Sequence, residues 1–200
     1  MILLLRPNRG GFLRPFGCGW FIREFLLGHG PESSPTIDPE VGACQEDIFY
    51  YYKLALHRAY AEDAVAWENE ERVKKGKSIY TPEEYEERVA YLLSRIPYKL
   101  TKCRYHSFQR YFHWLKQLSW VEFTGREEPS SLQQGYPDAP PRKYYRLTSK
   151  GIKSPDYAWS NPQLTLYPER GLEYFREKRR ERKYVKKSPT KRRVSSSPSR

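Results

Sequence analysis

The amino-acid sequence predicts a mainly α-helical fold with a small β-hairpin and a flexible basic tail. Apolar residues recur three or four positions apart in three segments, 47–75, 82–96 and 102–118, which is the spacing of amphipathic helices. Two short segments with strand-forming residues follow, and a connection containing Pro and Gly separates them, as in a β-hairpin. Residues 171–200 are rich in Lys, Arg, Ser and Pro, a composition typical of disordered tails.

The first predicted helix runs from Asp47 to about Lys75, because neither Pro nor Gly interrupts the stretch before Gly76. Its apolar residues form one stripe: Ile48, Tyr52, Ala55, Ala59 and Tyr60. Its distal half, 67–72, is strongly polar, so we expect that part to project beyond the core or to contact a partner.

The second predicted helix has signals at both ends. Thr81 can cap it, Pro82 suits the first helical position, and two glutamates follow at the positive end of the helix dipole. Pro97 ends it. Its apolar residues fall on one face, which is expected to be buried: Tyr85, Val89, Leu92, Leu93 and Ile96.

The third predicted helix follows a short connection, with Thr101 as its expected cap. Its apolar residues again keep helical spacing: Phe108, Tyr111, Phe112, Leu115 and Leu118. The hairpin is then expected to consist of a strand over 120–124 and a returning strand over 142–148, joined by the polar segment 125–141.

Two short motifs resemble the winged helix-turn-helix domains of PadR-like and MarR-like regulators. The returning strand, Tyr144 to Gly151, resembles the YxLTxxG ending of the wing. Leu115 to Val121 resembles the LxxLxxxGxV/I junction between recognition helix and wing. The order helix, helix, short turn, helix, hairpin is also that of this fold. The resemblance covers about residues 80–151, and it implies a DNA-binding protein that regulates transcription.

The chain departs from this family pattern in two places. Ser119 and Trp120 stand where the usual turn glycine precedes the strand. Pro155 follows soon after Gly151, which argues against the long C-terminal dimerisation helix of PadR-like proteins.

The face of the third helix that lies opposite its apolar stripe predicts a contact with DNA. Every member can donate a hydrogen bond and none is acidic: Lys102, His106, Gln109, Arg110, His113 and Gln117. Arg and Lys can pair with guanine or phosphate, and Gln with adenine, when such a helix lies in the major groove. An ordinary solvated face usually mixes acids with bases, so the composition favours contact.

The predicted wing adds four cations: Arg126, Arg142, Lys143 and Arg146. Such residues would reach phosphates or the adjacent minor groove. Because Glu127, Glu128 and Asp138 lie in the same segment, a hairpin that only covers the core is an equally acceptable interpretation.

The net charge of +12 is placed unevenly along the chain. Residues 171–200 hold 12 Lys and Arg against 3 Glu, a net of +9, and the other residues hold 24 against 21 acids, a net of +3. The tail is therefore expected to add salt-sensitive affinity for nucleic acid that does not depend on sequence. A solubilising tail is the alternative interpretation.

Four segments are expected. These are an N-terminal arm over 1–43, a winged-helix domain over 44–152, a linker or docking segment over 153–170, and the basic tail over 171–200. Within the arm, Phe21 to Leu27 either forms a short helix that docks on the main domain or belongs to a largely disordered segment.

The cysteines argue against a metal centre. Cys18, Cys44 and Cys103 lie far apart, which excludes a disulfide framework and favours an intracellular location. A site made of Cys103, His106 and His113 fails because ten helical residues span about 15 Å.

Neither catalysis nor membrane insertion is expected. The sequence has no Gly-rich phosphate loop and no motif of a hydrolase or metalloprotease, so we expect no enzyme activity and no cofactor. The apolar stretch 12–27 is broken by Arg, Pro and Glu, which excludes a membrane span.

Two alternatives to DNA binding stay open. The abundant Tyr and Trp could stack on unpaired bases in an RNA-binding or ribosome-associated winged helix. The domain could also serve protein–protein contacts, with the Glu-rich end of helix 47–75 as an interaction arm. A homodimer through helix 47–75 is plausible because many such regulators bind paired half-sites.

Overall fold

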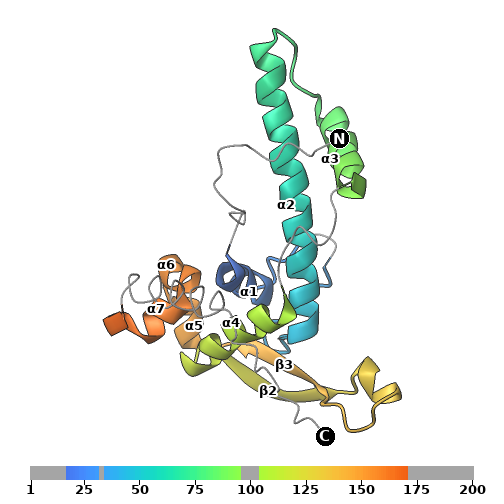
Figure 1. The fold of residues 1–200 in the computed structure, drawn as a ribbon. Helices are drawn as coiled ribbons and strands as arrows, with labels where there is room; N and C mark the ends of the chain where they lie inside the picture. The colour runs from blue at the N-terminus through green and yellow to red at the C-terminus, as the bar shows by residue number, and fades with distance from the viewer. Residues whose placement is uncertain (1–16, 32–33, 96–103, 171–200) are drawn as a thin grey trace, which may run out of the picture. The chain divides into compact units, whose positions relative to one another are not determined.

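The computed structural model of the chain describes residues 17–31, 34–95 and 104–170 (Figure 1). It divides into two units, Met1–Pro162 and Gln163–Arg200. The described part of the chain is mainly helical and contains one small antiparallel sheet of three strands, so the predicted fold class is confirmed at that level. The expected cap Thr101, the expected contact residue Lys102 and the tail 171–200 lie outside the described residues.

The helices fall into a longer and a shorter group. The longer helices are α1 (Cys18–Leu26), α2 (Gln45–Lys74), α3 (Pro82–Arg95) and α4 (Tyr105–Gln117). The short ones follow the hairpin: α5 (Ser149–Lys153), α6 (Asp156–Ser160) and α7 (Pro162–Leu166), with 3-10 turns η2 (Ser131–Gln134) and η3 (Pro168–Arg170). The three helices predicted from apolar spacing are confirmed as α2, α3 and α4.

Side-chain caps explain where two of these helices begin. At α3, the Thr81 hydroxyl accepts the N–H of Glu84 at 3.3 Å, and the Glu84 carboxylate accepts the N–H of Thr81 at 2.9 Å. This reciprocal capping box confirms Thr81 as the cap. At α2, the Cys44 sulfur accepts the N–H of Asp47 at 3.4 Å, so the helix starts two residues earlier than predicted.

The sheet has the strand order β1–β3–β2. The strands are β1 (Ala43–Cys44), β2 (Val121–Glu128) and β3 (Arg142–Leu147). In the hairpin Val121 pairs with Leu147, and the register is irregular between Phe123 and Glu127. The predicted strand over 120–124 thus continues to Glu128. The two-residue strand β1 was not predicted, because a pair of residues carries no periodic signal.

The segment that precedes α2 belongs to the core. In α1, Ile22 and Phe25 have no exposed surface, and the helix contacts α2, α4, α6 and β3. Gly42 adopts a φ of +70°, and a Cβ atom there would lie 2.0 Å from the carbonyl oxygen of Tyr145, so only glycine lets β1 meet β3. Of the two interpretations of residues 21–27, a short docked helix is confirmed.

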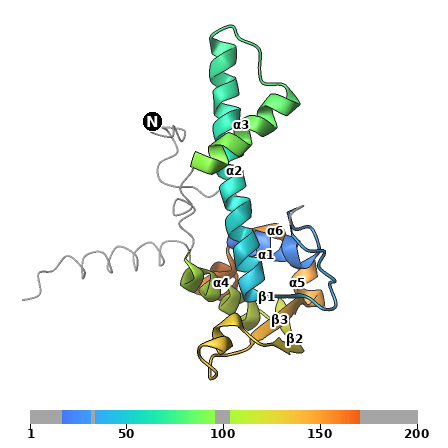
Figure 2. The same cartoon turned by 90° about the vertical axis from the view of Figure 1, so that its right-hand side faces the viewer.

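Helix α3 packs against α2 and not against α4. Both views show it beside the part of α2 that lies farthest from the sheet (Figures 1 and 2). Of its predicted face, Val89 and Leu92 are buried and Tyr85 and Leu93 are half-buried, while Ile96 lies outside the described residues. Among the described residues, α2 is thus the helix that α3 packs against, whereas the order of the predicted elements suggested helix 102–118 as its neighbour.

The chain that follows the hairpin docks on α1. Trp159 is fully buried, and its ring centroid lies 4.7 Å from that of Trp120. A Cβ atom on Gly19 would lie 2.2 Å from the Trp159 carbonyl oxygen, so α1 and α6 touch backbone to backbone. Arg23 pairs with Asp156 across the same contact. Within the segment 153–170, expected as a linker or docking segment, α6 thus docks on α1.

Candidate nucleic-acid interface

Helix α4 is held in place by an aromatic face. Phe108, Phe112 and Leu115 have no exposed surface. The ring centroid of Phe108 lies 5.3 Å from that of Phe49 of α2, and the ring centroid of Phe112 lies 4.9 Å from that of Tyr145 of β3. The second pair meets edge to face, an arrangement typical of aromatic pairs. The helix is thus fixed between α2 and the sheet, which leaves its opposite face to solvent.

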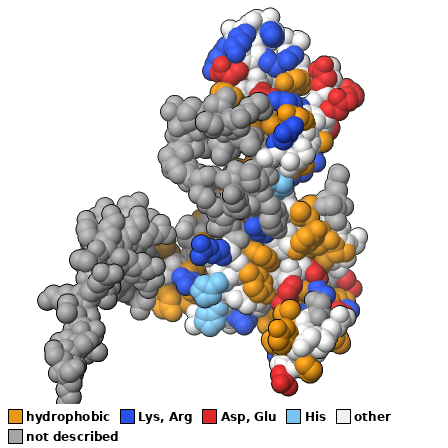
Figure 3. Space-filling model, turned by 45° about the vertical axis from the view of Figure 1, so that its right-hand side comes forward, with side chains coloured by type: hydrophobic (Ala, Val, Ile, Leu, Met, Phe, Trp, Pro, Cys, Tyr) orange, Lys and Arg blue, Asp and Glu red, His pale blue; other side chains and the backbone are white. Residues whose placement is uncertain are grey.

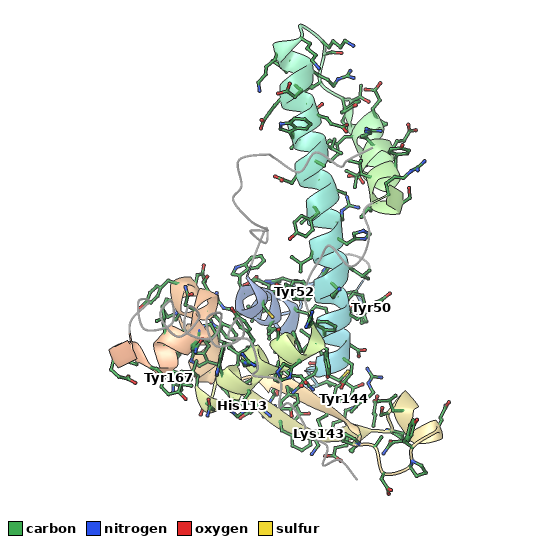
Figure 4. All side chains as sticks on the ribbon, viewed as in Figure 1. Tyr50, Tyr52, His113, Lys143, Tyr144 and Tyr167 are labelled. Carbon is green, nitrogen blue, oxygen red and sulfur yellow. The ribbon has the colours of Figure 1, made fainter. Side chains whose placement is uncertain are left out.

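The exposed face of α4 contains the predicted residues that the structure describes: His106, Gln109, Arg110, His113 and Gln117. Two further exposed cations accompany them, Arg104 at the N-cap and Lys116. We call these seven residues the α4 face. Figure 3 shows Lys, Arg and His side chains gathered over this helix, and Figure 4 labels His113 among them.

The α4 face has little internal pairing. An Arg110 guanidinium nitrogen lies 3.3 Å from Nε2 of His106, one helical turn away. Within the described residues, none of the Arg and Lys side chains of this face forms a salt bridge with a carboxylate. Their charge is therefore available to an anionic partner.

Two of the wing cations are neutralised within the hairpin. Arg126 donates from Nε to the Glu128 carboxylate at 3.1 Å, and its guanidinium lies 4.5 Å from the Tyr144 ring centroid. Hydrogen bonds from Tyr144 and Arg126 lower the pKa of Glu128, so the acid stays ionised beside the cation. The Lys143 ammonium lies 3.1 Å from the Glu127 carboxylate of the paired strand.

Arg146 is held by acids from two segments. Its Nε donates to Glu122 of β2 at 2.9 Å, and Nη1 lies 2.6 Å from the carboxylate of Glu40, which precedes β1. Glu122 and Arg146 are directly paired across the strands, so this contact follows from the register.

Arg142 faces inward. One nitrogen of its guanidinium lies 2.7 Å from the Cys44 sulfur and 2.5 Å from an Asp47 carboxylate oxygen. Its Nε is buried and has no hydrogen-bond partner among the described residues. The hydrogen bond to Cys44 is the main reason that the pKa of Arg142 lies above its ordinary value, and the nearby charge of Asp47 also raises it. Arg142 thus joins the hairpin to the start of α2. This structural role accounts for the residue without any contact to a phosphate of a nucleic acid.

The start of α4 is also tied to α2. The Tyr105 hydroxyl donates to the Glu46 carboxylate at 2.8 Å, and its ring meets Phe49 edge-on at 5.1 Å. Burial, then the bond to Glu46, raises the pKa of Tyr105, so the phenol keeps its proton. The α4 face is thereby presented on a fixed element.

The site residues predicted from the sequence fall into two groups in the structure. The α4 residues come together on one exposed face, whereas the four wing cations are each paired with a carboxylate of the protein. Sequence reasoning missed Lys116, although it lies at helical spacing from Gln109 and His113 and carries the expected charge. It also missed Phe123, an exposed ring on β2.

Two further observations concern metal binding and membrane insertion. The described residues contain no group of three or more His, Cys, Asp or Glu side chains placed to hold a metal ion, and Cys103 lies outside them. In the same ranges, no helix has both the length and the apolar character needed to cross a bilayer.

Comparison with protein-family models, with curated proteins and with solved structures finds no match for this chain.

Proposed function

We propose that this chain is a winged-helix DNA-binding protein, a regulator of transcription, that places α4 in the major groove of duplex DNA. The single observation that carries the proposal is the α4 face, which offers cations and hydrogen-bond donors without a carboxylate partner. Arg and Lys on such a helix can pair with guanine O6 and N7 or with phosphate, and Gln can pair with adenine.

The packing of the helices supports a winged helix assembled from different elements than the sequence indicated. Three helices that contact one another, α1, α2 and α4, precede the hairpin β2–β3 in the chain. In this arrangement the first part of α2 is the helix beside α4. The distal part of α2 and α3 then form an insertion, the α2–α3 arm, between the second and third helices of the domain.

The wing takes a smaller part in this proposal than its composition suggested. Arg126, Lys143 and Arg146 could contact phosphate only by giving up a carboxylate of their own, and such an exchange gains little free energy. The basic tail would add affinity through counterion release, independently of α4. A homodimer would use the surface of α2 that α1 and α3 leave uncovered.

Titration of labelled duplex DNA, single-stranded DNA and structured RNA tests the proposal. The full chain is compared with Arg110→Ala and with Arg58→Ala, a matched loss of one exposed arginine on α2, where Arg58 pairs with Glu62 and Glu86. We expect Arg110→Ala to weaken duplex binding by roughly 1–3 kcal/mol if the residue reads a base. Arg58→Ala should leave the affinity unchanged.

A chain that ends at residue 170 shows whether the folded part binds by itself. This boundary keeps Trp159, which a chain ending near Ser154 would lose from the core. If the shortened chain binds no duplex at low salt, the proposal is wrong. Tighter binding of structured RNA than of duplex, lost in Arg110→Ala, would replace DNA by RNA as the ligand.

A further inference from the structure

The ring of Phe123 lies on the side of the sheet that faces α4. Phe123 of β2 is paired directly with Tyr145 of β3, and side chains of directly paired residues share one face. Tyr145 is 7% exposed because it packs against Phe112 of α4, whereas Phe123, at the free edge of the sheet, is 44% exposed. An exposed aromatic ring therefore lies beside the proposed recognition helix.

Two lysines accompany this pair of rings. The Lys143 ammonium lies 5.5 Å from the centroid of Phe123, and the Lys116 ammonium lies 5.6 Å from that of Tyr145. Lys116, the two rings and Lys143 thus form a continuous row from α4 to the hairpin, which we call the aromatic row. Glu127 offsets the charge of Lys143, but Lys116 forms no salt bridge within the described ranges.

An exposed phenylalanine alone needs no explanation, because single apolar residues are common on protein surfaces. The neighbourhood makes this one different. Aromatic side chains next to cations are the surfaces on which unpaired bases stack, since the ring meets the base while the cation meets the adjacent phosphate. A closed duplex offers no free base face to such a ring.

We propose that Phe123 stacks on an unpaired base, so that the preferred ligand is a duplex with a single-stranded segment beside the site of α4. The inference rests on the proposed function and adds the class of substrate: a junction between paired and unpaired DNA. Lys116 contacts the phosphate that links the two parts.

Three ligands of matched sequence test it with the full chain: a blunt duplex, the same duplex with a short single-stranded overhang, and the overhang strand alone. The overhang should tighten binding of the unsubstituted chain by about tenfold, the size expected for stacking of one base. Phe123→Leu keeps the apolar contact with Tyr145 but removes the ring, and it should lose this gain while binding the blunt duplex as before. Phe123→Tyr should retain it.

A fluorescent base analogue in the overhang supplies a direct measurement. Stacking should quench its emission with the unsubstituted chain and with Phe123→Tyr, but not with Phe123→Leu. Leu132→Ala, which shortens another exposed apolar side chain of the hairpin connection, is the control and should leave the quenching intact.

The outcomes distinguish the two proposals. Binding of the blunt duplex without any gain from the overhang, or a gain that persists in Phe123→Leu, overturns the stacking inference and leaves the proposed function standing. Absence of binding to every DNA ligand overturns the proposed function itself.

Discussion

The sulfur atom of Cys44 joins three parts of the molecule. Cys44 ends β1, caps α2 by accepting the N–H of Asp47 at 3.4 Å, and accepts a hydrogen bond from Arg142 of β3 at 2.7 Å. Burial is the main reason that the pKa of this thiol rises to about 11. Its neutral form is therefore the one that the folded protein stabilises.

This raised pKa predicts how stability depends on pH. The unfolded thiol ionises near its ordinary pKa, whereas the folded thiol keeps its proton up to about pH 11, so the stabilising contribution is present below pH 9 and is lost as pH rises from 9 to 11. We expect the free energy of unfolding to fall across this window by on the order of 1–2 kcal/mol more than in Cys44→Ala. Urea unfolding at several pH values measures it. Parallel curves for the two proteins would contradict the prediction.

Gly151 closes the wing motif for a steric reason. A Cβ atom at this position would lie 2.3 Å from the carbonyl oxygen of Trp120, and the carbonyl oxygen of Gly151 itself accepts the indole N–H of Trp159 at 3.1 Å. Thr148 connects the same backbones, since its hydroxyl donates to Ser119 at 2.6 Å and accepts from the N–H of Gly151 at 3.0 Å. The glycine lets α5 lie directly on the turn that connects α4 to β2.

We predict that Gly151→Ala destabilises the fold by about 2 kcal/mol or more, because backbone atoms on both sides must move apart. Chemical denaturation followed by tryptophan fluorescence measures the loss, since Trp120 and Trp159 are both buried at this contact. Gly135→Ala is the control: a Cβ atom there meets nothing within 4 Å, and its φ is −103°. Equal effects of the two substitutions would show that close packing is not the cause.

Ser119 forms the turn before β2, at the position where the motif that the sequence resembles has glycine. Ser119 has a φ of +57°, the left-handed conformation that glycine adopts most easily. Ser119 therefore adopts this conformation at a cost in backbone energy of about 1 kcal/mol. The hydrogen bonds from the Ser119 N–H to Lys116 and from Thr148 to the Ser119 carbonyl stabilise it.

At the scale of elements, the sequence predicted what depends on neighbouring residues and missed what depends on distant ones. The spacing of apolar residues and the cap at Thr81 specify α3, and both are local. The same apolar stripe fits a packing partner on either side, so periodicity does not tell whether α3 meets α4 or α2. Long-range contacts decide: Arg88 forms two hydrogen bonds of 2.7 Å with the Glu68 carboxylate, and Arg58 reaches Glu86.

The same distinction between local and long-range determinants applies to the candidate site. The face of α4 follows from helical geometry, because residues three and four apart share a side. The wing charges depend on register, which the sequence does not reveal: Lys143 is opposite Glu127 and Arg146 is opposite Glu122 only once β2 and β3 have paired. The four cations that the sequence suggests as a phosphate-binding edge are thus each paired with a carboxylate of the protein.

At the scale of the whole chain, charge is concentrated at the C-terminal end, and this predicts a separation of affinity from selectivity. Residues 171–200 carry a net charge of +9, whereas the rest of the chain carries +3.

Each phosphate neutralised by a Lys or Arg changes the slope of log affinity against log salt by about −0.9. A chain ending at residue 170 should therefore bind duplex DNA with a distinctly shallower slope than the full chain, because the release of several counterions is lost. The ratio of affinities between the unsubstituted protein and Arg110→Ala should stay the same in both lengths, because in the proposed function α4 reads the groove independently of residues 171–200. Fluorescence anisotropy at several salt concentrations measures both quantities. An unchanged slope would assign the electrostatic contact to the folded part, and a ratio that collapses on removal of residues 171–200 would show that α4 acts only together with them.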